Sequence, residues 1–171
     1  RGKRGIVLDL KQAQGLEAML RLIRDADVLI YNVRPQAMAR LGLSWDDVRA
    51  VNPRLLYVGT YGYSQKGPYA PKAAYDDLIQ GASGVPWVVS QTGATPNYAP
   101  VNFADRVTGL HAVYTVTTAL YQRERSGVGQ SIEVPMFESI SHFVLGDHLA
   151  GLSWMQPEGG AGYQRLLARR P

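Results

Sequence analysis

Three short apolar segments, separated by stretches with helical periodicity, most constrain how this chain can fold. The segments span residues 6–10, 27–31 and 55–61. Between the first two, apolar residues recur at helical spacing from Leu16 to Ile23, which predicts an amphipathic helix. Strand, helix and strand within about thirty residues form the βαβ pattern, whose strands run parallel and are buried on both faces. The sequence therefore predicts an α/β fold built on a parallel sheet.

Helix and loop signals follow one another through the first half of the chain. Pro35 suits the first turn of a short helix that ends near Gly42, and a capping-box spacing at 44–47 starts another helix. Glycine and proline make 62–74 a long loop, and in open α/β sheets ligands bind beyond strand ends of this kind. A short helix is expected over 75–81.

The second half of the chain is expected to contain a long helix and a further strand. Residues 82–101 are rich in glycine, proline and threonine and are expected to be irregular. The long helix begins near Asp105 and ends at the Ser-Gly-Val-Gly-Gln turn of 126–130. Alternation over 130–137 predicts a strand, and another helix follows it. The helical spacing predicts the buried face of the long helix to contain Val113, Tyr114, Thr117, Leu120 and Tyr121.

The composition disfavours several classes of protein. With no cysteine, the chain has neither a disulfide framework nor a thiolate metal site. It has no apolar run of about 18 residues and no signal-peptide pattern, so a cytoplasmic protein without membrane attachment is expected. The net charge of +4 comes from scattered basic residues, which disfavours nucleic-acid binding and fits a phosphate-bearing small molecule. No metal-binding motif occurs, so no metal site is predicted.

Asp105 is the residue best placed for chemistry. At the amino end of a helix, unpaired backbone N–H groups and the helix dipole favour a charged carboxylate. A charged, partly desolvated aspartate can attack an activated carbonyl. Aspartate is also a preferred helix cap, so spacing alone favours a capping role and leaves the catalytic role open.

Four stretches of the chain are distinctive in their order and spacing. They are ADVLIYNVRP at 26–35 with RLG at 40–42, NPRL at 52–55 with GYSQKGPY at 62–69, YDDLIQ at 75–80 with SG at 83–84, and ADRVTG at 104–109 with RERSGVGQSIEV at 123–134. Together they resemble the class III CoA-transferases, the CaiB/BaiF-type family. The resemblance covers roughly the first 150 residues.

The resemblance implies a Rossmann-like parallel sheet with flanking helices, in which 1–153 form part of the large domain of the family. Residues 154–171 would form a glycine-containing loop and a connection toward a second domain. The resemblance also implies an intertwined homodimer. At least one end of the chain is expected to be cut, because the sequence opens on Arg1 without an initiator methionine and stops at Pro171.

The resemblance assigns coenzyme A contacts to Asn32, Val33 and Arg40. Val33 stands where the family more usually has an aromatic residue, and Tyr31 where it has an acid, so the adenine pocket is expected to differ in detail. Asn32 also lies between a strand and a helix, so a role as a helix cap stays open.

The same resemblance implies that Tyr75 and Asp76 are catalytic residues beside Asp105, and it singles out a run of glycines. Racemases of this fold have a histidine at the position of Tyr75, and a tyrosine is a poor base at neutral pH, so Tyr75 and Asp76 favour the transferase branch. Gly159, Gly160 and Gly162 resemble in position the glycine-rich loop that covers the active site of the family. A plain linker is the alternative for these glycines.

The reaction implied by the resemblance is transfer of coenzyme A from an acyl-CoA to a carboxylic acid. Asp105 would attack the thioester, giving an aspartyl anhydride and then an aspartyl-CoA thioester. Coenzyme A is then part of the substrate, and no tightly bound cofactor is expected. Two alternatives stay open: an acyl-CoA racemase or isomerase that uses Asp105 as an acid or base, and a non-catalytic module that binds coenzyme A or a nucleotide.

Overall fold

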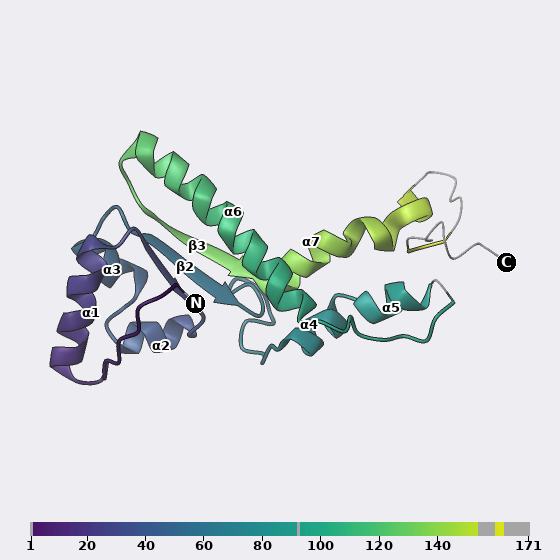
Figure 1. The fold of residues 1–171 in the computed structure, drawn as a ribbon, viewed down its shortest axis with the longest axis horizontal. Helices are drawn as coiled ribbons and strands as arrows, with labels where there is room; N and C mark the ends of the chain where they lie inside the picture. The colour runs from purple at the N-terminus through teal and green to yellow at the C-terminus, as the bar shows by residue number, and fades with distance from the viewer. Residues whose placement is uncertain (1, 92, 154–159, 163–171) are drawn as a thin grey trace. The chain divides into compact units, whose positions relative to one another are not determined.

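The computed structural model forms two compact units, each assembled from two separate stretches of sequence (Figure 1). The first unit comprises Arg1–Tyr61 and Val113–Glu133, and the second comprises Gly62–Ala112 and Val134–Pro171. Each unit has its own hydrophobic core. The structure describes residues 2–91, 93–153 and 160–162.

The first unit contains a parallel sheet with the strand order β1-β2-β3. Its strands are β1 (Val28–Tyr31), β2 (Leu56–Tyr61) and most of β3 (Gln130–Pro135). β1 and β2 pair in parallel, with Val28 opposite Leu56. β3 runs in the same direction as β2, because the Gly129 N–H bonds to the Pro53 carbonyl before the two strands and the Phe137 N–H bonds to the Gly62 carbonyl after them. The predicted parallel α/β fold is thus confirmed.

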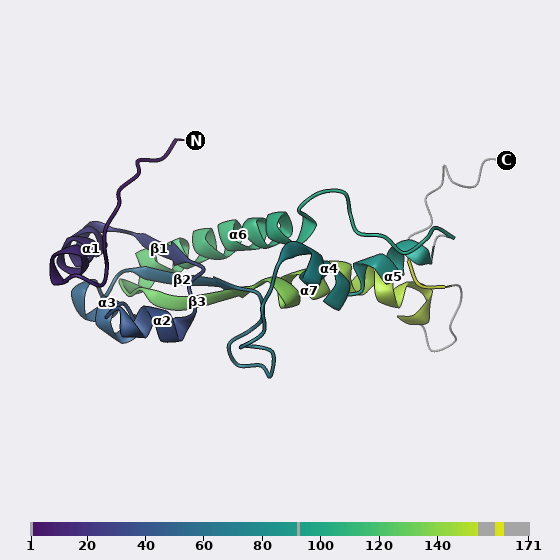
Figure 2. The ribbon, with the colours of Figure 1, turned by 90° about the horizontal axis from the view of Figure 1, so that it is seen from below.

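Three amphipathic helices cover one side of these strands (Figure 2). They are α1 (Ala13–Asp25), α2 (Pro35–Arg40) and α3 (Trp45–Val51). The predicted helix boundaries are found here. Gly42, just after α2, has a φ of +70°, and Ser44 and Asp47 form the capping box of α3. The buried residues that these helices share with β2 and its neighbours are Ile23, Met38, Leu43, Val48, Leu55 and Tyr57.

The second unit is mainly helical. Its helices are α4 (Asp76–Ala82), α5 (Val85–Ser90), the beginning of α6 (Phe103–Ser126), α7 (Met136–Leu149) and the short 3-10 helix η1 (Ala150–Ser153). Its core contains Tyr63, Ile79, Val85, Ala104, Val107, Ile140 and Val144. These residues come from the 62–74 loop and from α4 to α7, so the core fixes the start of α6 beside α4.

Three of the predicted elements are wrong in type or orientation. Residues 6–10 form no strand, and Ile6 and Val7 are 66% and 98% exposed, because no strand among the described residues pairs with this segment. The stretch predicted to be irregular contains α5, because Pro86 lies in the first turn of that helix, where proline starts a helix rather than breaking one.

The third correction concerns α6, whose buried face is the opposite of the predicted one. Val113, Tyr114 and Tyr121 are 53–64% exposed. The buried positions of α6 are instead Ala104, Val107, Thr108, Ala112, Ala119 and Arg123. Most of these residues are small, so the helix packs closely through them and leaves its larger apolar side chains outside. Counting apolar residues therefore selected the wrong face.

Candidate functional site

Asp105 is the third residue of α6, so it lies in the first turn of the helix and is not the cap residue. Its side chain is exposed, which corrects the expected partial burial. The reason is local, since Ala104 and Val107 turn toward the core and direct the intervening residues outward. At this position the positive end of the helix dipole favours negative charge, and an exposed carboxylate is accessible to an electrophilic carbonyl.

The backbone of Asp105 is held by a side chain from another helix. The Asp105 N–H donates to Oδ2 of Asp76, at 2.9 Å, and Asp76 is the first residue of α4. The structure thus brings together two carboxylate residues that the sequence had singled out. Asp76 supplies a partner for one of the otherwise unpaired N–H groups at the start of α6, while its own part in the chemistry stays a prediction.

Gln80, which sequence reasoning missed, holds Asp76 from the other side. Its Nε2 donates to Oδ1 of Asp76 at 2.5 Å, and its Oε1 accepts from the Ala99 N–H at 2.9 Å. The side chain is fully buried, with 0% exposure. A signal was present in the sequence, because residues four apart on a helix face each other and can hydrogen bond. The contact with Ala99 had no such signal.

Tyr75 immediately precedes α4 as its cap residue and is 73% exposed. Its side chain makes no capping hydrogen bond. Tyr75 therefore directly precedes the helix that carries Asp76 and Gln80, and its ring lies at the surface. Whether this tyrosine marks the transferase branch stays a prediction.

The predicted coenzyme A residues belong to the first unit. Asn32 and Val33 follow directly after β1, and Arg40 is the last residue of α2; all three are exposed. The cap residue of α2 is Arg34, so Asn32 is not the cap of that helix. Exposed side chains beyond the carboxyl end of a parallel strand occupy the position where α/β proteins commonly bind ligands.

Three tyrosines of the same strands, Tyr31 of β1 and Tyr57 and Tyr61 of β2, form a cluster. The hydroxyls of Tyr31 and Tyr61 are 2.8 Å apart, and the Tyr57 hydroxyl donates to the Leu43 carbonyl at 2.7 Å. Burial is the main cause that raises the pKa of Tyr31 above its ordinary value, and it raises those of Tyr57 and Tyr61 as well. Gly59 leaves room for the Tyr61 ring, because a Cβ at position 59 would lie 2.3 Å from the Tyr61 hydroxyl and the ring would have to shift.

One of the predicted glycines is held against the helices of the second unit. Gly162 has a φ of +87°, and its N–H donates to the Asp147 carbonyl at 2.7 Å. That N–H is thus engaged with α7 rather than available to an oxyanion in this structure. Gly160 is exposed, and Gly159 lies outside the described residues.

The 62–74 loop is an irregular segment, as predicted, and is anchored at its beginning. The Ser64 N–H donates to Oε1 of Glu138 at 3.1 Å, and the Tyr63 ring is buried against Phe137. Gly62 permits a close approach of the chain, because a Cβ would lie 1.9 Å from that of Ala74. The first residues of the loop are therefore fixed by contacts with the beginning of α7.

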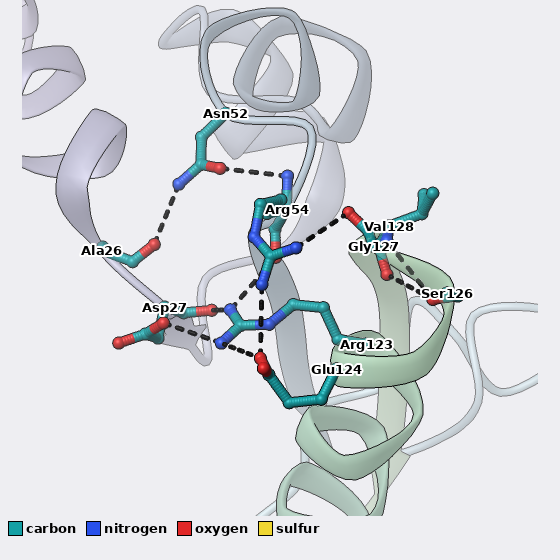
Figure 3. Close-up of polar contacts among 9 residues, drawn as sticks. All are labelled: Ala26, Asp27, Asn52, Arg54, Arg123, Glu124, Ser126, Gly127 and Val128. Carbon is teal, nitrogen blue, oxygen red and sulfur yellow. Dashed lines mark hydrogen bonds and ion pairs between the residues drawn. The ribbon is translucent and has the colours of Figure 1, made fainter.

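At the other end of the sheet, before β1 and β2 begin, lies a network around Arg123 (Figure 3). This arginine is 7% exposed. Its guanidinium donates to the carbonyls of Asp27 and Arg54 and forms an ion pair of 2.8 Å with the Asp27 carboxylate. Asn52 also bonds to this region through the Ala26 carbonyl. These contacts join α6 to the segments that enter β1 and β2, mostly through backbone carbonyls, so we interpret the network as structural.

The described residues contain no group of three or more histidine, cysteine, aspartate or glutamate side chains that could hold a metal ion. His111, His142 and His148 all lie in helices, as expected. Within the part of the chain that the structure describes, no helix has both the length and the apolarity needed to cross a membrane.

Curated relatives of the chain are named as CoA-transferases. A succinate–glutarate CoA-transferase of Agrobacterium fabrum is 40% identical over 138 residues, which are 81% of this chain and 34% of the relative. An acetyl-CoA:oxalate CoA-transferase of Acetobacter aceti is 37% identical over 145 residues, 84% of this chain and 37% of the relative. The chain therefore spans about a third of the length of these curated relatives.

Solved structures share the fold. A CaiB/BaiF family protein from Brucella suis aligns with a TM-score of 0.86 and 34% identity, covering 95% of this chain and 43% of that protein. Rv3272 from Mycobacterium tuberculosis aligns with a TM-score of 0.79 and 31% identity, covering 92% of this chain and 44% of that protein. The model of CoA-transferase family III matches residues 1–166. The chain belongs to CoA-transferase family III.

Proposed function

We propose that this chain carries the nucleophile of an enzyme that transfers coenzyme A from an acyl-CoA to a small carboxylic acid. The observation that carries the proposal is the placement of Asp105: its carboxylate is exposed in the first turn of α6, and its backbone N–H is held by Asp76. The relatives of the chain are named for the same class of reaction. A fixed backbone with a free carboxylate suits covalent catalysis, because the attacking atom is oriented without being blocked.

The first half of the reaction forms and consumes an anhydride. An oxygen of the Asp105 carboxylate attacks the thioester carbonyl of the acyl-CoA, the C–S bond breaks, and coenzyme A leaves as a thiolate. The thiolate then attacks the aspartyl carbonyl of the anhydride. The donor acid departs as a carboxylate, and an aspartyl-CoA thioester remains.

The second half reverses these steps with a different acid. The acceptor carboxylate attacks the aspartyl-CoA carbonyl, which releases the thiolate and forms a second anhydride. The thiolate attacks the acceptor carbonyl, giving the product acyl-CoA and restoring the Asp105 carboxylate. Holding the thiolate near the anhydride makes its return effectively intramolecular.

The remaining predicted residues have supporting parts in this proposal. Asn32, Val33 and Arg40 would contact coenzyme A, with Arg40 suited to a phosphate because its guanidinium is exposed and always charged. Gly160 could present its N–H to a tetrahedral oxyanion. A second copy of the protein would complete an intertwined homodimer. Succinate, glutarate and oxalate are the first acceptors to test, because they appear in the names of the relatives.

The test is covalent labelling of the full-length protein. The protein is incubated with a panel of acyl-CoAs and trapped with hydroxylamine, and the modified peptide is located by mass spectrometry. We expect a hydroxamate at Asp105 and none in the Asp105→Asn variant. Asp77→Asn is a matched control, because Asp77 is also an exposed carboxylate in the first turn of a helix.

Two other outcomes would contradict the proposal. Exchange of the substrate α-proton with solvent, without any label on Asp105, would identify a racemase or isomerase. Binding of coenzyme A with neither label nor proton exchange would identify a non-catalytic binding module.

A further inference from the structure

Gln80 is a polar side chain with 0% exposure in the core of the second unit, beside the buried Ile79. Burying an amide is unfavourable unless its donor and acceptor both find partners. Here both ends are bonded, to the Asp76 carboxylate and to the Ala99 N–H. An apolar side chain of similar size would fill the same space, so packing alone does not explain an amide at this position.

The two partners of Gln80 require opposite hydrogen-bonding groups. Oδ1 of Asp76 can only accept, so it needs the NH₂ end of the amide, whereas the Ala99 N–H can only donate and needs the carbonyl end. Among the common side chains of this length, an amide alone offers both groups at neutral pH. A carboxylate would lose the donor and add negative charge beside Asp76.

Both partners of Gln80 lead to the beginning of α6. Asp76 accepts the Asp105 N–H with its second carboxylate oxygen. Ala99 lies four residues before Phe103, where α6 begins. Gln80 therefore fixes the segment that enters the helix and, through Asp76, the first helical turn itself.

We infer that Gln80 is a positioning residue for the transfer reaction, holding the Asp76 carboxylate and the approach to α6 so that the Asp105 carboxylate stays in one place. The inference rests on the proposed function. Gln80 has no hydrogen bond to Asp105 among those described, and its influence passes through Asp76 and the backbone. Small displacements of a reacting group reduce rates strongly, so the effect should appear in the rate rather than in substrate binding.

The test uses two substitutions in the full-length protein and one matched control. Gln80→Met keeps the length of the side chain and removes both hydrogen bonds. Gln80→Glu keeps the acceptor for Ala99 and removes the donor. Asn52→Leu is the control, because Asn52 is also a buried amide, bonded to the Ile23 and Ala26 carbonyls and to the Arg54 N–H, but lies in the first unit.

Two measurements are made on each variant. The first is amide hydrogen exchange of Asp105 and Ala99, which needs no substrate. The second is the rate of hydroxylamine-trappable labelling of Asp105 per folded molecule, as a function of acyl-CoA concentration. We expect faster exchange at both amides in Gln80→Met, and a maximal labelling rate lower by roughly 10- to 100-fold with an unchanged half-saturating concentration.

The control and the pH profile separate positioning from general stability. Asn52→Leu should lose thermal stability while keeping the wild-type labelling rate. Gln80→Glu should recover relative to wild type as the pH falls, because a protonated carboxyl can donate to Asp76 and still accept from Ala99. Equal labelling rates in Gln80→Met and wild type, or unchanged exchange at Asp105 and Ala99, would overturn the inference.

A failure of the proposed function has a different signature. In that case the wild-type protein acquires no label from any donor. The hydrogen-exchange measurement still decides whether Gln80 holds the first turn of α6. Unchanged exchange in Gln80→Met would remove the positioning role, whether or not the wild type is labelled.

Discussion

Arg123 in the first unit and Gln80 in the second are both buried polar side chains, and the two serve different purposes. Arg123 carries a charge, and its hydrogen bonds end on the Asp27 carboxylate and on backbone carbonyls. Gln80 is neutral, and one of its bonds ends on a carboxylate that in turn holds the Asp105 backbone. The charge of Arg123 is paired within the first unit and stabilises the sheet. The bonds of Gln80, in contrast, leave the Asp105 carboxylate exposed.

The largest expected effect on stability comes from Arg123→Met. This change removes the partner of two backbone carbonyls and of the Asp27 carboxylate, so we expect a loss of about 3 kcal/mol in the free energy of unfolding. Urea unfolding measures it. Labelling of Asp105 per folded molecule should stay at the wild-type rate. If the variant is stable but labels slowly, Arg123 would have a part in the reaction rather than in stability, and the contrast with Gln80 would be wrong.

Tyr31→Phe tests the opposite end of the same sheet. At neutral pH the change should cost about 1 kcal/mol, because the hydrogen bond between two partly buried hydroxyls is lost. The folded-state pKa of Tyr31 is raised, so its contribution is fully present below the unfolded value of about 10 and is lost as the pH rises above it. Unfolding measured at neutral and alkaline pH should therefore show a smaller pH dependence in the variant. An equal dependence in both proteins would contradict the assignment.

Asp76→Ala should lower the free energy of unfolding less than Arg123→Met does, but it should have a large effect on labelling. The change removes the partner of a helix N–H and the acceptor of the buried Gln80 amide, and each loss typically costs about 1 kcal/mol, which thermal unfolding can detect. The labelling rate of Asp105 should fall much further than this loss of folded protein explains. Asp77→Ala provides the control, since Asp77 lies next in the same helix and is exposed. Equal labelling rates in the two variants would show that Asp76 does not position Asp105.

Asp105→Asn should change stability least. The side chain is exposed, so we expect a difference within about 0.5 kcal/mol of wild type, together with complete loss of labelling. Thermal unfolding measures the stability and mass spectrometry the labelling, both on the same preparation. A large loss of stability would mean that the Asp105 side chain has a structural contact, and the contrast with Arg123 would then weaken.

Elements that depend on neighbouring residues were predictable from the sequence. The Gly42 turn and the capping box of Ser44 and Asp47 involve residues a few positions apart, and the apolar segments of β1 and β2 carry their own signal. Residues 6–10 have the same kind of signal but pair with no strand in the part of the chain that the structure describes, so local pattern alone could not decide their structure.

For the candidate site, the sequence singled out Asp105 and Asp76 but neither Gln80 nor the contacts that join these residues. Asp105 and Asp76 stand out through motif and resemblance. Their contact joins residues 29 positions apart, and the Ala99 contact of Gln80 joins residues 19 apart. Such pairs depend on the packing of whole helices. The inner face of α6 was mispredicted for a related reason, since small residues such as Ala112 and Ala119 mark a close helix contact that hydrophobicity alone does not reveal.

Asp105 donates to Asp76 with its main-chain N–H and not with its side chain. Other side chains could therefore occupy position 105 and keep this hydrogen bond. Every amino acid except proline supplies the same N–H group, so the support of the first turn does not depend on which side chain stands there. Cysteine or histidine could therefore be installed at position 105 without rebuilding its surroundings. A single substitution at position 105 would accordingly change the reacting group and leave the support of the first turn in place.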